Sequence, residues 1–214
     1  MRFTAQAFVA AAALAMIAAP AHAQAPGQWK TYVSRDLQFS FSAPGNVTIE
    51  RGTYKGERSG DHPAVIFRST VNGIEYRAIV TDFNSQVGDA ASLLEEAVVT
   101  FMGTRKTLMD NYGRVNNLYG RKVTVDFPNN GGRAMSSFYF NKGYLYQMQA
   151  TVTPANGDFA TPDLSRFVDS EVFLLRNTEA TATELKVPPE PAPPAAAGAG
   201  RGGAAPAGRG APGR

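Results

Sequence analysis

The chain contains no cysteine among its 214 residues. Disulfide bonds are therefore excluded, as are metal centres built on thiolates. Histidine occurs only twice, which leaves too few ligands for a histidine-rich metal site. Beyond the first residues, no apolar run approaches the ~20 residues that a membrane-spanning helix needs. These absences mean that the fold has to be held by a hydrophobic core of its own.

Net charge is also small in most of the chain. The sequence has 21 Lys and Arg against 18 Asp and Glu. The excess lies at the two ends: Arg2 near the start, and Arg201, Arg209 and Arg214 with Glu190 near the end. Removing these four cations and one anion leaves equal numbers of both signs. A neutral folded part gives no indication of a basic nucleic-acid-binding surface, so we expect no nucleic-acid partner.

Residues 1–23 have the three parts of a secretory signal peptide. Arg2 gives a positive start, and a short apolar run follows it up to Pro20. The sequence Ala21-His22-Ala23 then matches the small-residue cleavage motif. A single arginine excludes a twin-arginine signal. We therefore expect Sec-dependent export with cleavage after Ala23, a periplasmic or secreted location, and no transmembrane segment after the signal is removed.

The remaining sequence divides into one domain and a tail. Residues 24–186 have the length and the apolar content of a single domain. Residues 187–214 are almost entirely Pro, Gly, Ala and Arg. Such a segment cannot bury enough apolar surface to offset the entropy of ordering. The sequence predicts a folded domain over 24–186 and a disordered tail over 187–214.

The turn Asn72-Gly73 gives the clearest local signal. An Asn-Gly pair between two β-rich runs is typical of a type I′ hairpin. Its register pairs Val71 with Ile74 and Arg68 with Arg77, and it collects apolar residues on one face. We predict a hairpin over residues 64–83, with one face in the core.

A second hairpin is predicted over residues 133–153. We interpret Asn141-Lys142-Gly143 as a three-residue loop, because this register places Phe138 opposite Tyr146 and gathers the large apolar groups on one side. A two-residue loop would mix the two faces. On this reading Tyr139 points away from the core and is exposed.

Other segments complete the prediction. Asp89 caps a helix with apolar residues at helical spacing and with Glu95 and Glu96 on its wet side. A short helix starts at Thr161-Pro162. Strands are expected near residues 37–42, 47–49, 121–127 and 172–175, and loops over 52–63 and 112–119. The predicted fold class is α+β, an antiparallel β-sheet covered by helices.

Six short motifs occur in order along the chain: Trp29-x-x-Tyr32, Phe39-x-Phe41-x-x-Pro44, Thr81-Asp82-Phe83, Tyr119-Gly120-Arg121, Gly143-Tyr144-Leu145-Tyr146-Gln147 and Arg166-Phe167-x-x-Ser170. In these motifs and their order the chain resembles a group of exported bacterial proteins of unknown function, which are similar in turn to the PsbP-like fold of the extrinsic photosystem II subunits. The resemblance implies an α/β/α layered sandwich and a non-enzymatic assembly or stabilising role. Some relatives hold metals through histidine, but only His62 remains here after processing, so no site residue is carried over.

Two groups of residues are candidates for chemistry. Ser59, Asp61 and His62 contain the residue types of a catalytic triad, but such close neighbours in one loop rarely converge as a triad requires. Arg68 and Arg77 are directly opposed on adjacent strands, which is destabilising. Either Glu75 and solvent relieve this repulsion, or the pair binds an anion.

We therefore expect no catalytic residue, no metal site and no cofactor. The leading hypothesis is a non-enzymatic periplasmic or secreted protein that acts through contacts with a protein or with the cell envelope. The alternative is a small-molecule or anion-binding module that uses the sheet face near Arg68 and Arg77.

Overall fold

The computed structural model describes residues 27–83, 89–153, 159–173 and 181–190. The predicted signal peptide and residues 191–214 of the predicted tail lie outside these ranges. Seven antiparallel strands form one sheet, in the spatial order β3 (Thr48–Gly56), β4 (Gly60–Val71), β5 (Ile74–Asp82), β9 (Tyr144–Val152), β8 (Arg133–Asn141), β7 (Leu118–Asp126) and β6 (Lys106–Val115).

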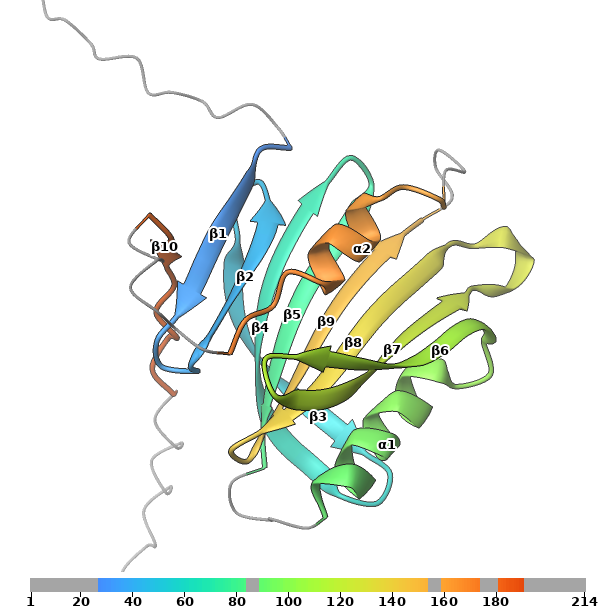
Figure 1. Ribbon diagram of the computed structural model, residues 1–214, viewed down its shortest axis with the longest axis horizontal. Helices are drawn as coiled ribbons and strands as arrows, with labels where there is room; N and C mark the ends of the chain where they lie inside the picture. Colours follow the sequence, from blue (N-terminus) through green and yellow to red (C-terminus); the bar gives the residue numbers. More distant parts are fainter. Residues whose placement is uncertain (1–26, 84–88, 154–158, 174–180, 191–214) are drawn as a thin grey trace, which may run out of the picture.

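Both faces of this sheet are covered (Figure 1). Helix α1 (Ala90–Met102) packs on one face, mainly against β8 and β7. The other face carries the short helix α2 (Asp163–Val168) and a small sheet of β10 (Thr183–Glu184), β1 (Trp29–Ser34) and β2 (Phe39–Pro44). The antiparallel sheet is as predicted. The second layer, however, is as much strand as helix, so helices alone do not cover the sheet.

The Asn72-Gly73 hairpin has the predicted register. Val71 pairs with Ile74, and Arg68 pairs with Arg77. Asn72 and Gly73 both have positive φ, of 53° and 76°, as a type I′ turn requires. Because the two-residue turn determines the pairing, every residue of β4 and β5 is placed on the expected face.

The register predicted for the second hairpin is wrong. Its loop contains only Lys142 and Gly143, both with positive φ, and Asn141 pairs with Tyr144. Tyr139 therefore pairs with Tyr146, and it is fully buried rather than exposed. The prediction assumed one buried face, but β8 and β9 lie at the centre of a sheet that is covered on both sides. A register that distributes the large apolar residues over both faces of the sheet therefore has no energetic cost here.

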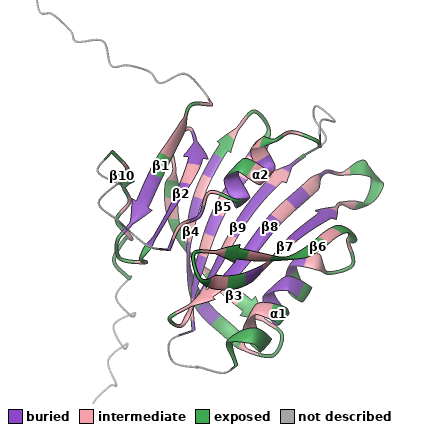
Figure 2. Cartoon of the chain, in the orientation of Figure 1, coloured by how far each residue is buried: buried purple, intermediate pink, exposed green. Residues whose placement is uncertain are grey.

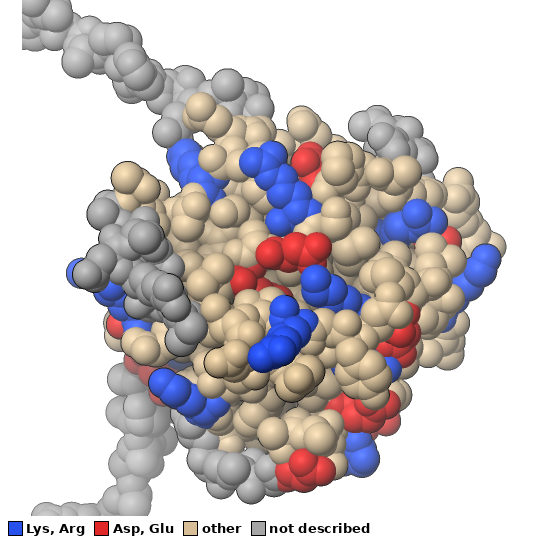
Figure 3. Space-filling model, in the orientation of Figure 1, with Lys and Arg blue, Asp and Glu red and all other residues tan. Residues whose placement is uncertain are grey.

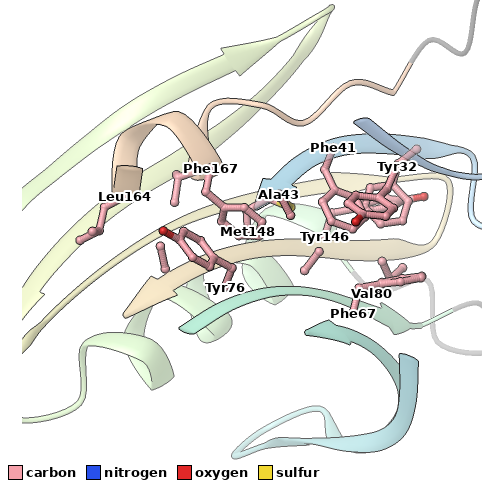
Figure 4. Packing of buried hydrophobic residues seen from close by; sticks show 14 of the residues in the cluster. Tyr32, Phe41, Ala43, Phe67, Tyr76, Val80, Tyr146, Met148, Leu164 and Phe167 are labelled. Carbon is pink, nitrogen blue, oxygen red and sulfur yellow. The ribbon is translucent and has the colours of Figure 1, made fainter. Parts of the chain in front are cut away.

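Two hydrophobic clusters result from this arrangement (Figure 2). In the first, Phe39 and Phe41 of β2 pack on Phe67 and Tyr146 of the large sheet. Figure 4 shows Leu164 and Phe167 of α2 in the same cluster, close to Tyr76 and Met148. The second cluster lies under α1 and contains Phe83, Ala97, Val98, Phe101, Val123, Val125, Ala134, Phe138 and Leu145.

Two predicted loops are strands. Most of residues 52–63 belongs to β3 and β4, and most of residues 112–119 belongs to β6 and β7. β3 and β6 are the edge strands of the sheet, and most of their side chains are exposed or half-buried. Polar, exposed strands give no alternating apolar pattern, which is the signal on which strand prediction depends.

A pair of glycines lets the sheet curve over Tyr139. Gly113 of β6 pairs with Gly120 of β7, which in turn pairs with Tyr139 of β8. A Cβ atom added at Gly120 would lie 2.1 Å from the Phe138 carbonyl oxygen and 2.5 Å from Tyr139 Cδ1. At Gly113 it would lie 2.6 Å from the Tyr139 hydroxyl. The missing side chains therefore make room for the tyrosine ring.

Helix α1 begins as predicted but buries one residue that we placed in solvent. Asp89 accepts a hydrogen bond from the Ala91 amide at 3.1 Å. Glu96 is 5% exposed and accepts hydrogen bonds from the Arg58 and Ser59 amides. Burial raises the pKa of Glu96, but these amide donors outweigh it and hold the pKa below its ordinary value. Glu96 therefore fastens α1 to the β3–β4 turn.

The C-terminal elements are only partly as predicted. Helix α2 follows Pro162 and buries Leu164 and Phe167, as expected. In place of a strand over 172–175, Val172 makes an isolated antiparallel bridge with Ser40. Residues 174–180 lie outside the described ranges. Residues 187–190, the first part of the predicted tail, contact the folded domain through Asp36 and Arg51.

Candidate functional site

A groove beside α1 is the best candidate for a binding site. It is about 360 Å³ in volume and runs between the helix and the part of the sheet formed by β3, β4, β5 and β9. We call it the α1 groove. Among the described residues its lining holds three cations and no Asp or Glu. The lining residues are Thr53, Tyr54, Lys55, Ala64, Ile66, Arg77, Ile79, Ala97, Thr100, Phe101, Arg105, Gln147 and Gln149.

Arg77 reaches the groove from the centre of the sheet. It lies directly opposite Arg68, as predicted, and both guanidinium groups approach Glu75. Arg68 Nε is 3.3 Å from a Glu75 oxygen, and Arg68 Nη2 is 2.8 Å from Glu50. Arg77 is less well paired, because its ion pair with Glu75 is longer, at 3.6 Å from Nε, and it has no second carboxylate partner among the described residues. Neither Nε makes a hydrogen bond there.

The sequence left two alternatives for the opposed arginines, compensation by Glu75 and solvent or the binding of an anion. The structure shows compensation by carboxylates. Glu75 and Glu50 relieve the repulsion between the two arginines. Arg68 takes most of that compensation, while Arg77 lines the groove. The prediction that the pair binds an anion therefore rests mainly on Arg77.

Arg105 supplies the second cation at the C-terminal end of α1. It donates to the backbone oxygens of Met102 and Phe101, so it caps the helix end, where positive charge is favourable. Its guanidinium carbon lies 5.1 Å from the Phe101 ring centre. Burial lowers the pKa of Arg105. No carboxylate pairs with it in the described part of the chain, so its charge remains available to a ligand.

Two glutamines of β9 give the groove a polar floor. Gln149 pairs with Arg77 across the strands, and Gln147 pairs with Ile79. Their amides form a ladder, from Gln147 Nε2 to Gln149 Oε1 at 3.3 Å and from Gln149 Nε2 to Thr151 Oγ1 at 3.0 Å. Side-chain amides both donate and accept hydrogen bonds, so this floor suits a ligand with several oxygen atoms.

Neither Arg105 nor the two glutamines were predicted from the sequence as site residues. Polar residues at alternating positions of a central strand were the available signal for Gln147 and Gln149. Arg105 gave no such signal, because it follows the end of a helix and comes near β5 only in the folded chain.

The triad-like group in β4 has no catalytic geometry. His62 is 4% exposed, and its Nε2 lies 3.0 Å from the backbone oxygen of Ser59 rather than from the hydroxyl. Asp61 is exposed. The His62 ring packs on Phe83 at 4.1 Å between centres. The loop predicted over residues 52–63 is therefore wrong at His62, which is a buried residue of β4 that packs on Phe83.

An exposed aromatic surface lies on the other side of α1. Tyr112 is 83% exposed and Tyr119 is 70% exposed. Arg121 lies over the Tyr112 ring at 5.1 Å and Arg114 over the Tyr119 ring at 5.3 Å. Together with Leu94, Phe140 and neighbouring residues, the two tyrosines line a hollow of about 340 Å³. We call this region the tyrosine surface.

Two further observations concern the described residues as a whole. They contain no group of three or more His, Asp or Glu that could hold a metal ion. None of their helices has the length and apolar character needed to cross a membrane. On the face in Figure 3, cations and anions are interspersed rather than gathered by sign.

Comparisons with known proteins find similarity among solved structures. No protein-family model matches the sequence, and no curated protein matches it. Among solved structures, the chain is similar to the solution structure of cyanobacterial PsbP (CyanoP) from Synechocystis sp. PCC 6803. The identity is 12%, the TM-score is 0.46, and the match covers 72% of this chain and 97% of that chain.

Proposed function

We propose that this chain is a non-enzymatic periplasmic or secreted binding protein and that the α1 groove holds an anionic small molecule. The observation that carries the proposal is the lining of the groove, which among the described residues contains Arg77 and Arg105 but no Asp or Glu. Outside the lining, Arg77 has one ion pair, with Glu75 at 3.6 Å, and no carboxylate of the described residues pairs with Arg105. The class of ligand follows from this chemistry. A guanidinium presents several N–H donors in a plane and suits a carboxylate or a phosphate.

The size and walls of the groove agree with such a ligand. A volume of about 360 Å³ falls at the small end of the range for ligand pockets. Ile66, Ile79 and Phe101 provide apolar walls, while Gln147 and Gln149 provide hydrogen-bonding groups. Apolar walls with a few polar groups are typical of small-molecule sites. We therefore expect a compact ligand with one anionic end.

Isothermal titration of the purified protein with pyrophosphate and with citrate tests this proposal. We expect at least one of the two anions to bind, and Arg77→Gln to weaken that binding about 10- to 100-fold. This factor corresponds to the loss of a charge-assisted hydrogen bond of about 1.5–3 kcal/mol. Because added salt screens charge, the affinity of the wild-type protein should also fall as ionic strength rises.

Arg35→Gln is the matched control. It removes the same charge from an exposed arginine near β1, which lies on the opposite face of the sheet. Its affinity should equal that of the wild-type protein. Failure of both anions to bind, or equal loss in the two variants, would contradict an anion site at Arg77.

A second candidate function is contact with a protein or with the cell envelope, and the tyrosine surface favours it. Large exposed aromatic side chains are unusual on a monomer and are enriched where proteins make contacts. Here Tyr112 and Tyr119 are both largely exposed, side by side on one hairpin. This candidate needs no small-molecule ligand, and its surface is separate from the α1 groove.

Sedimentation with insoluble peptidoglycan and with anionic lipid vesicles tests the second candidate. We expect the wild-type protein to sediment with one of these probes, and the double variant Tyr112→Ser, Tyr119→Ser to bind at least tenfold more weakly. Val99→Ser, at an exposed position of α1 outside the hollow, should bind like the wild type. Equal sedimentation of the double variant and the wild type would remove the tyrosine surface from consideration.

A further inference from the structure

Residues 187–190 lie against one end of the sheet, beside Asp36 and Arg51, and we call this segment the strap. It follows β10, which pairs with β1 in parallel. The Leu185 amide donates to the Val33 oxygen at 2.8 Å, and the Val187 amide donates to Asp36 Oδ2 at 3.3 Å. The strap contains Val187, Pro188, Pro189 and Glu190. Its path is therefore set by specific hydrogen bonds with residues far away in the sequence.

Arg51 of β3 binds the backbone carbonyl of Pro188. Its Nε and Nη2 both donate to the Pro188 carbonyl oxygen, at 3.0 and 2.6 Å. A proline has no N–H group, so only its carbonyl can form a backbone hydrogen bond. In an extended proline segment these carbonyls have no internal partners. The guanidinium, which offers donors and no acceptor, is therefore the complementary group.

The strap does not fill the site where it lies. A cavity of about 370 Å³ remains between the strap and the end of the sheet. Leu37, Pro63, Val65, Val80 and Tyr144 form its apolar side. Grooves with aromatic and apolar walls are the usual receptors for extended proline-rich peptides. The strap therefore leaves open volume beside it.

We propose that this groove is a docking site for an extended proline-containing segment of another protein, and that the strap occupies it within the chain as an intramolecular competitor. The Pro188-Pro189 pair that lies in the groove indicates the class of ligand. Arg51 is the residue that donates hydrogen bonds to its backbone carbonyl. The site lies at the end of the sheet near β1 and β2, and it shares no lining residue with the tyrosine surface. It is also independent of an anion in the α1 groove.

Fluorescence anisotropy with a labelled peptide tests the proposal in the full chain. The peptide has the sequence of residues 185–194, LKVPPEPAPP. The double variant Pro188→Gly, Pro189→Gly weakens the strap and leaves the groove intact. We expect it to bind the peptide at least fivefold more tightly than the wild-type chain does. Adding Arg51→Gln to this variant should reduce the affinity at least tenfold, whereas adding Lys106→Gln, at an exposed position of the edge strand β6 outside all three sites, should not.

A control peptide with Gly-Gly at the positions of Pro188 and Pro189 should bind at least tenfold more weakly to the Pro188→Gly, Pro189→Gly variant. Thermal melting of each variant confirms that it is folded. Equal affinity of the strap variant and the wild type, or unchanged affinity after Arg51→Gln, would overturn the proposal. Self-association of the strap variant without peptide binding would overturn it as well, because the occupant would then be a second copy of this chain.

Discussion

Replacing Gly120 with alanine is expected to lower the free energy of unfolding by about 3 kcal/mol, because overpacking costs about 1–3 kcal/mol and a clash with backbone costs more. The new Cβ would lie 2.1 Å from the Phe138 oxygen, which belongs to the neighbouring strand and cannot move aside as a side chain does. The melting temperature should fall by about 6–12 °C for a domain of this size. Chemical denaturation and calorimetry measure both quantities.

Gly52→Ala is the matched control for this substitution. Gly52 lies in the edge strand β3, and its nearest neighbour would be Ile66 Cδ1 at 2.9 Å, the end of a flexible side chain. We expect a change of less than about 0.5 kcal/mol. If Gly120→Ala unfolds at the same denaturant concentration as the wild type, the close packing that we infer between β7 and Tyr139 is contradicted.

The largest expected effect of pH comes from Glu171. This carboxyl is 2% exposed and lies between α2 and β8. The Ser137 hydroxyl donates to its Oε1 at 2.8 Å, while Oε2 has no hydrogen-bond partner among the described residues. Burial raises the pKa of Glu171 to about 8, although the Ser137 hydrogen bond and the Lys122 charge act in the opposite direction. Asp169 raises it further.

The sign of the pH dependence follows from these contacts. In the unfolded chain the carboxyl titrates near its ordinary pKa of 4.5. Between that value and about 8 the folded protein holds a proton that the unfolded chain has released. Stability should therefore fall as pH rises through this range, by at most about 1.4 kcal/mol per pH unit. The stabilising contribution is complete below the unfolded pKa and is lost above the folded one.

Glu171→Gln removes this titration and keeps an oxygen that can accept from Ser137. We expect the variant to be clearly more stable than the wild type at pH 8.5, and close to it at pH 5. Denaturant titrations at a series of pH values between 5 and 9 measure the difference. Parallel stability profiles for the two proteins would show that Glu171 is ionised in the fold and would contradict the burial argument.

Sequence patterns predicted the elements that obey local rules. The Asn72-Gly73 turn has a backbone geometry that admits few residues, so the register of β4 and β5 followed from it. The cap at Asp89 and the helical spacing after it gave α1. In each case the residues that determine the structure lie within one short segment of the chain. These elements can therefore be predicted from the sequence alone.

The remaining features depend on neighbours that the sequence does not identify. Lys142 was interpreted as part of a longer loop, because nothing local indicates that β8 and β9 are covered on both faces. The polar strand β6 pairs with β7, but its side chains are mostly exposed and leave no apolar pattern. Glu96 is polar and still buried, because amides of a distant turn bind it.

The candidate site was predictable only in part. Arg77 was found because the hairpin register placed it opposite Arg68, a repulsion that demands an explanation. The sequence could not show that Glu75 and Glu50 compensate Arg68 more fully than Arg77. Nor could it bring Arg105 of the α1 end into the same groove. Long-range packing, rather than any motif, assembles this lining.

The most direct test of the central claim, that the α1 groove binds an anion, is an NMR titration of the labelled protein with pyrophosphate. We expect saturable shifts of backbone amides and of the Gln147 and Gln149 side-chain amides, clustered on β5, β9 and the last turn of α1. The same titration of Arg77→Gln should give much smaller shifts. Shifts that cluster elsewhere, or that persist unchanged in Arg77→Gln, would contradict it.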